Sequence, residues 1–218
     1  MNKRKILITV TIFSTLCLVL TFFQISKKDN VFANSFTFES LAKYVESYKP
    51  ITSKKTADLI DESKYIEQYY FKKHLVSANL TDDEAKEEAF NQILEETALF
   101  EVAKKENELA TKEDALKMSN EVREIFKNET EENKEVIQNV KDVIKGSNMT
   151  EDQYFNEFLV NEYIIIISIE NLFGKITKDY EEEVKYTVWE EFKQKEVDKF
   201  VNKNQEYINE FKLKYSIK

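Results

Sequence analysis

Glycine and proline are almost missing from this chain, which has two glycines and one proline among its 218 residues. These are Gly146, Gly174 and Pro50. β-Sandwiches and barrels need a turn about every 8–12 residues, and glycine and proline supply many of the backbone conformations of such turns. The sequence therefore predicts an all-α fold built from a few long helices.

The N-terminus contains an uncharged apolar run, Ile6–Phe23, behind three basic residues. Its length lies at the lower edge of what crosses a hydrocarbon core of about 30 Å as a helix. Lys3, Arg4 and Lys5 favour a cytoplasmic N-terminus, so everything after Phe23 is expected on the other side of the membrane. We expect a single-pass protein of the cell membrane that contacts the lipid bilayer through Ile6–Phe23 and carries an extracytoplasmic domain.

Cleavage of this segment is the alternative, because Val31 and Ala33 supply suitable residues at the −3 and −1 positions of a signal-peptidase site. A cut after Ala33 would yield a secreted protein. A lipoprotein is disfavoured, since Cys17 lies inside the apolar run behind Leu16. In either case residues 1–33 form a signal peptide or an anchor with its tether, and residues 34–218 form the exported domain.

The exported domain is acidic, with 27 basic and 40 acidic residues and a net charge of −13. Such a domain repels phosphate backbones and anionic headgroups, which argues against binding to nucleic acid or to a membrane surface. The charge serves solubility first, and a second role would be long-range attraction of cationic, unfolded polypeptides. Cys17 is the only cysteine, so no disulfide supports this domain.

Capping motifs and apolar periodicity divide the exported domain into helices. Thr81 and Thr150 each stand three residues before a Glu or Gln in a capping box, and Thr111 starts a further helix. Asn107 and Gly146 suit helix ends. The predicted helices cover residues 57–76, 81–106, 111–126, 136–146 and 150–174, and a last element capped by Thr177 runs almost to the C-terminus.

Two apolar patterns concern the last two elements. The run Tyr163–Ile169 is rich in β-branched residues that also suit a strand, but its flanks keep a helical period, which favours a buried helix. In the last element, apolar residues recur alternately four and three apart and form a heptad seam with one polar member. Its members are Val197, Val201, Asn204, Ile208, Phe211 and Tyr215. The seam is expected to pack on its own domain, and a homodimer is the alternative.

The reactive side chains indicate no enzyme. His74 is the only histidine, so neither a His-rich zinc site nor a Ser-His-Asp or Cys-His set can be built, and we interpret it as a half-exposed helix residue. Two glycines cannot form a Gly-rich phosphate loop. Trp189 and the Tyr69-Tyr70-Phe71 cluster are more typical of a core than of a ligand platform. We expect no catalytic residue, no metal ligand and no cofactor.

The stretch Thr81–Glu113 resembles a known family. Its Ala-Phe-Asn-Gln-Ile-Leu-Glu helix, the Ala-Lys-Lys that follows and the next Thr-Lys-Glu helix start resemble the helical core of the SurA/PrsA extracytoplasmic chaperones. Gly146–Phe155 resembles that family's Gly-x-x-x-Ser-Glu-Glu-x-Tyr helix start, and Tyr207–Ile217 resembles its C-terminal helix. The resemblance covers about residues 50–218 and implies a SurA N-terminal-like helical chaperone domain.

The chain also departs from that family. It has no counterpart of the parvulin isomerase domain, because Gly174 leads directly into the last element, and Val45–Thr52 retains at best a trace of the family's opening hairpin. The resemblance therefore implies a holdase without catalysis that binds unfolded or newly exported polypeptides, at residues that the sequence does not identify. The alternatives are a peptidyl-prolyl isomerase, by analogy with the family, and a structural or partner-binding membrane protein that uses the heptad seam.

Overall fold

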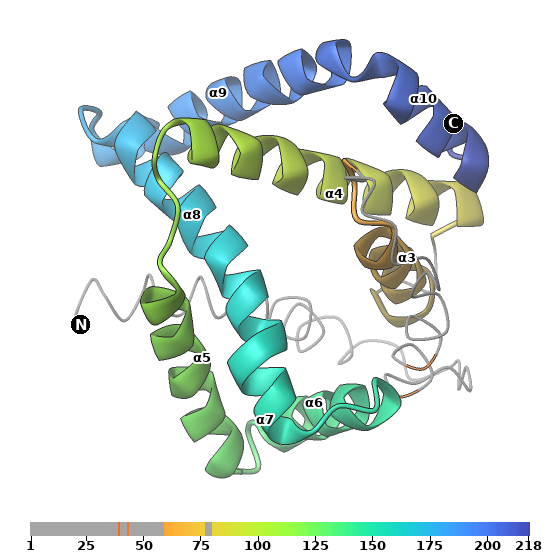
Figure 1. The fold of residues 1–218 in the computed structure, drawn as a ribbon, viewed down its shortest axis with the longest axis vertical. Coiled ribbons are helices and arrows are strands. Elements are labelled where there is room, and N and C mark those ends of the chain that lie inside the picture. The colour runs from red at the N-terminus through yellow and green to blue at the C-terminus, as the bar shows by residue number, and fades with distance from the viewer. Residues whose placement is uncertain (1–38, 40–42, 44–58, 77–79) are drawn as a thin grey trace.

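The computed structural model describes residues 39, 43, 59–76 and 80–218, and all regular structure in these ranges is helical (Figure 1). This confirms the all-α prediction for the described part of the chain, whereas the Ile6–Phe23 segment and the tether lie outside it. The elements are α3 (Glu62–Phe71), η1 (Lys72–Val76), α4 (Asp82–Lys105), α5 (Lys112–Lys127), α6 (Lys134–Gly146), α7 (Glu151–Gln153), η2 (Tyr154–Phe158), α8 (Leu159–Thr177), α9 (Glu182–Lys203) and α10 (Gln205–Tyr215). The two η segments are π-helices.

Three helices begin at the predicted threonines. The Thr81 backbone N–H donates to Glu84 Oε2 at 2.8 Å, and the Glu84 N–H donates back to Thr81 Oγ1 at 3.3 Å. Thr111 and Thr150 form the same reciprocal bonds with the residue three positions later. Each box satisfies backbone donors that a helix start would otherwise leave without partners, which explains why these starts were predictable.

Helix ends follow the prediction less closely. Asn107 adopts a φ of 60°, as expected for a residue that terminates a helix. At the end of α6 the left-handed residue is Asn148, with a φ of 53°, and Gly146 is the last helical residue. Asparagine tolerates this conformation because its short polar side chain can hydrogen-bond locally.

The predicted boundary between the last two long helices is wrong. Gly174 lies inside α8, and Thr177 is the last residue of that helix, where its hydroxyl donates to the Phe173 carbonyl at 2.7 Å. Helix α9 begins after Glu181, which makes no side-chain capping bond. Burial of Thr177 favours continuation of α8 past the glycine. A helical glycine costs only about 1 kcal/mol relative to alanine, which such burial can offset.

The isoleucine run is helical, as predicted. Tyr163 and Ser168 in α8 are buried, and the isoleucines between them are half-buried. Figure 1 shows α8 crossing from the α9 end of the molecule towards α6, with α5 lying along it. Because α8 has neighbours on several sides, an apolar run that covers most of the helix circumference is at least half-buried there.

Two hydrophobic clusters support the fold. The first joins α3, α4 and α10, and its buried residues are Ile60, Tyr65, Ile66, Ala89, Phe90, Ile93, Leu94, Ile208, Phe211 and Ile217. The second joins α5, α6, η2 and α8, and its buried residues are Ala115, Val122, Val140, Tyr154, Phe155, Leu159, Val160 and Tyr163. Helix α4 contacts both α3 and α8, so it connects the two halves of the domain.

The heptad seam packs within the domain, as favoured. Ile208 and Phe211 are buried in the first cluster, and Val197, Val201 and Tyr215 pack against it. The seam is carried by two helices, because the helix is interrupted at Asn204, between α9 and α10. The Asn204 side-chain amide donates to the Phe200 carbonyl at 2.8 Å. The polar member of the seam is thus the position at which the helix changes direction.

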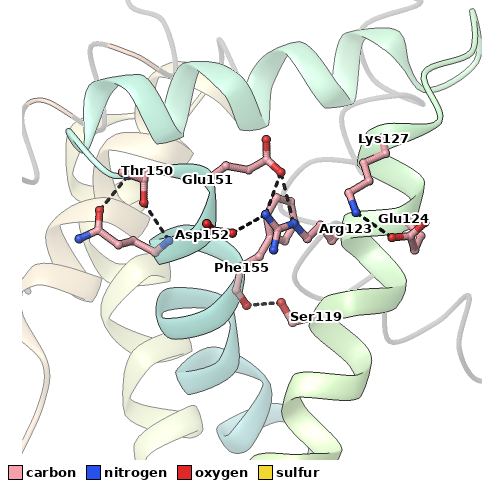
Figure 2. Close-up of polar contacts among 9 residues, drawn as sticks. Ser119, Arg123, Glu124, Lys127, Thr150, Glu151, Asp152 and Phe155 are labelled. Atoms are coloured by element: carbon pink, nitrogen blue, oxygen red, sulfur yellow. Dashed lines mark hydrogen bonds and ion pairs between the residues drawn. The ribbon is translucent and has the colours of Figure 1, made fainter.

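A polar contact fixes the start of α7 against α5 (Figure 2). The Arg123 Nη2 atom lies 3.2 Å from Glu151 Oε1 and 2.5 Å from Asp152 Oδ1, and its guanidinium stands 5.4 Å from the centre of the Phe155 ring. The Ser119 hydroxyl, which is buried, donates to the Phe155 carbonyl at the π-helix. The planar guanidinium can hold two carboxylates and a ring at once, which a lysine cannot do.

Candidate functional site

Four aromatic side chains on α8 and α9 contact one another at the surface of the domain, and one of them is exposed. Phe173 contacts Tyr186 at 5.8 Å and Trp189 at 5.5 Å between ring centres, and Trp189 stacks on Phe192 at 5.7 Å. We call these four residues the aromatic corner. Tyr186 is 67% exposed, and two further apolar side chains, Tyr180 just before α9 and Val184 in its first turn, are also exposed.

The helix that carries most of the aromatic corner is only partly embedded. No residue of α9, all of which the structure describes, is buried, although α9 packs against α4 and α8. Helices of a globular domain normally bury one apolar stripe. The large side chain of Tyr186 therefore stays accessible on a helix that the rest of the fold holds in place, which is typical of an interaction surface.

The C-terminal half of α8, which presents Phe173, is tied to the loop between α4 and α5. The Ala110 N–H donates to Ser168 Oγ at 2.8 Å. The Asn171 side-chain amide donates to the Glu108 carbonyl at 3.3 Å, and Lys175 Nζ donates to the Glu106 carbonyl at 2.8 Å. These bonds hold α8 against the α4–α5 connection, so Phe173, against which Tyr186 and Trp189 pack, is presented by a supported helix.

The two aromatic groups singled out in the sequence have different surroundings. Phe71 is buried, and Tyr69 contacts both Tyr70 and the buried Tyr65, so this cluster belongs with the first core, as predicted. Trp189 is half-buried and lies beside the exposed Tyr186. This difference could not be predicted from the residues alone, because both groups occur in helices of similar composition.

A charged cluster lies where α3, α4 and α8 meet. Lys64 Nζ on α3 is 2.8 Å from Glu96 Oε1 on α4 and 2.8 Å from Glu162 Oε2 on α8. Burial alone would lower the pKa of Lys64, but attraction to Glu162 and Glu96 outweighs it and raises the pKa. Burial raises the pKa of Glu162 despite the nearby lysine. One half-buried cation thus joins three helices.

A groove opens beside this cluster, with a volume of about 490 Å³. Its apolar lining includes Ile93, Phe100 and Ile165, and its polar lining includes Lys64 and Glu96. Sequence reasoning missed this grouping because carboxylates occur throughout the chain, and no spacing distinguishes Glu96 and Glu162 from the exposed ones. The lining therefore combines apolar side chains with charged ones from α3 and α4.

Glu67 adds a third carboxylate to this region and gives it a pH dependence. Burial, and then repulsion from Glu162, raise the pKa of Glu67 to about 7. Between the unfolded pKa of about 4.5 and this value the folded chain holds a proton that the unfolded chain releases, so the Glu67 contribution to stability falls as the pH rises.

We expect Glu67→Gln to be more stable than the parent chain by about 3 kcal/mol at pH 8 and by no more than about 1 kcal/mol at pH 5. Thermal unfolding of both proteins across this range measures the difference, with the exposed Glu87→Gln on α4 as a control for the loss of one charge. A difference between Glu67→Gln and the parent that stays constant with pH would contradict the assignment.

The remaining residues that could carry chemistry form no site in the described part of the chain. No group of three or more His, Asp or Glu side chains there could hold a metal ion. His74 is half-buried in η1 and stacks on Tyr70 at 5.7 Å between ring centres, and burial lowers its pKa. Within the described ranges, no helix is both long and apolar enough to cross a bilayer.

Comparison with known proteins places the chain in a family. It is 33% identical over 135 residues to the glutamate-rich protein GrpA of Alkalihalophilus pseudofirmus. The aligned stretch covers 61% of this chain and 82% of that protein. The chain belongs to the GrpA family. The name GrpA describes a glutamate-rich composition and no activity, and it does not bear on the resemblance to SurA/PrsA. No family model matches the chain, and no solved structure matches it significantly.

Proposed function

We propose that this protein is an extracytoplasmic, membrane-tethered holdase that binds unfolded exported polypeptides without catalysis. The aromatic corner carries the proposal, because it joins the exposed ring of Tyr186 to the half-buried rings of Phe173 and Trp189. Unfolded chains expose short apolar stretches, and aromatic side chains can bind such stretches with little dependence on their order. The corner supplies the client-binding residues that the sequence does not identify.

The resemblance to SurA/PrsA supports the same proposal. Capping boxes stand at Thr81 and Thr150, within the two stretches that resemble the family's helix starts, and Tyr207–Ile217 includes most of α10. We propose that the helices form a SurA N-terminal-like domain. The Ile6–Phe23 segment would hold this domain at the membrane, where newly exported chains emerge.

A holding assay tests the proposal. The full chain is placed in phosphatidylcholine vesicles, and a denatured, fluorescently labelled client is diluted into them. We expect a near-stoichiometric amount of the protein to keep most of the client in the supernatant after low-speed centrifugation. No protection at several-fold excess over the client would contradict the proposal.

Exposed residues provide the matched variants for this assay. Tyr186→Ser removes the most accessible ring of the aromatic corner, and we expect it to raise the amount of protein needed for protection several-fold. Leu213→Ser on α10 removes a side chain that is 82% exposed and distant in sequence, and we expect no change. Equal effects of the two substitutions would show that the corner is not the binding surface.

A further inference from the structure

We propose that the aromatic corner selects cationic amphipathic segments, that is, peptides with apolar residues on one face and lysine or arginine on the other. This inference rests on the proposed function and names the class of client. It follows from the arrangement of carboxylates around the exposed aromatic rings.

The carboxylates share a helix face with Tyr186. Glu182 and Glu183 precede it by four and three residues, and Glu190 follows it by four. Residues at these spacings are neighbours on a helix surface. All three glutamates are exposed, so the Tyr186 ring has negative charge on both sides of it along α9.

Basic residues do not cancel this charge. Residues 178–191 contain two lysines and six acidic residues. Lys185 is 2.9 Å from Glu182, and Lys193, just beyond this stretch, lies between Glu190 at 2.9 Å and Glu95 at 3.2 Å. These two lysines neutralise part of the charge of Glu182 and Glu190, but the excess of four acidic residues over residues 178–191 keeps the surface acidic.

Both components of the surface favour the same ligand. Aromatic faces attract ammonium and guanidinium groups, and exposed carboxylates attract them over about a Debye length, roughly 10 Å at moderate salt. The rings also bind the apolar face of the ligand. An acidic peptide with the same apolar residues would gain the apolar contacts and be repelled by the glutamates.

The chain carries its own reporter for this binding. Trp189 is the only tryptophan in the sequence and lies inside the aromatic corner. The full chain in phosphatidylcholine vesicles is titrated with two peptides of equal length that share their leucines and lack aromatic residues. One peptide has lysine at the polar positions and the other has glutamate, and Trp189 emission is followed against protein-free vesicles.

We expect the lysine peptide to bind about tenfold more tightly than the glutamate peptide at low salt, and the difference to shrink as the salt rises from about 0.05 to about 0.5 M. The double substitution Glu183→Gln/Glu190→Gln should remove most of this preference. The control Glu87→Gln/Glu121→Gln changes the net charge equally on α4 and α5, and it should keep the preference.

Three outcomes would overturn the inference. The first is equal affinity for both peptides. The second is an equal loss of the preference for the lysine peptide in the control double variant. The third is a Trp189 emission that neither peptide changes, in a protein that still protects the client. In each of these cases protection in the holding assay leaves the proposed function standing. If neither peptide changes Trp189 emission and the client also aggregates, the proposed function fails together with the inference.

Discussion

Replacing Phe211 with alanine is expected to lower the free energy of unfolding by about 4 kcal/mol. Phe211 is 3% exposed and packs against four rings, those of Tyr65, Phe90, Tyr207 and Tyr215, with Tyr65 at 5.2 Å and Tyr215 at 4.8 Å between ring centres. Alanine would leave a cavity in the centre of the first hydrophobic cluster, because neighbouring side chains relax only partly. Thermal unfolding should show a melting temperature lower by roughly 10 °C.

The same experiment tests whether the heptad seam acts within one chain. If α10 packs on α3 and α4 of its own domain, the melting temperatures of the parent and of Phe211→Ala should not depend on protein concentration, since no association accompanies folding. Leu213→Ala lies two residues away on the exposed side of α10, and its melting temperature should match that of the parent. A melting temperature that rises with concentration would favour the homodimer instead.

Replacing Lys64 with methionine is expected to cost about 3 kcal/mol at pH 8. The substitution keeps an unbranched side chain of similar length but removes the cation between Glu96 and Glu162, which are both only partly exposed. Two carboxylates, with Glu67 nearby, would then be close together without a compensating charge. Because such carboxylates take up protons when the pH falls, the loss should be smaller at pH 5 than at pH 8.

Lys195→Met provides the control for Lys64→Met, since Lys195 is an exposed lysine on α9. Its effect should stay within about 0.5 kcal/mol, as for most surface substitutions. Thermal unfolding at both pH values compares the two variants with the parent. Equal stability of Lys64→Met and Lys195→Met at pH 8 would show that the ion pairs at Lys64 do not hold α3, α4 and α8 together.

Sequence reasoning succeeded where the cause of a structure is local. The start of α4 depends on Thr81 and Glu84, which bond to each other's backbone within one turn. The end of the same helix depends on the ability of Asn107 to adopt a positive φ. Neither effect needs a distant partner, so the residues involved are sufficient to predict it.

Prediction from the sequence failed where a contact with a distant part of the chain decides whether a helix continues or ends. Gly174 resembles a helix end, yet α8 continues because Thr177 is buried against the rest of the domain. Asn204 occupies a heptad position, yet the chain turns there, and Ile208 and Phe211 reach the first cluster as part of a separate helix. In both cases burial outweighs the preference that the residue shows on its own.

The order of residues alone was enough to determine the helical class, the three capped helix starts and the presence of a heptad seam near the C-terminus, because periodicity and capping act over a few residues. The meeting of Lys64 with Glu96 and Glu162, and the exposure of Tyr186 beside Trp189, came only from how the helices pack. Those groupings depend on side chains from different helices, whose relative positions are set by the summed burial of both hydrophobic clusters and by no single motif.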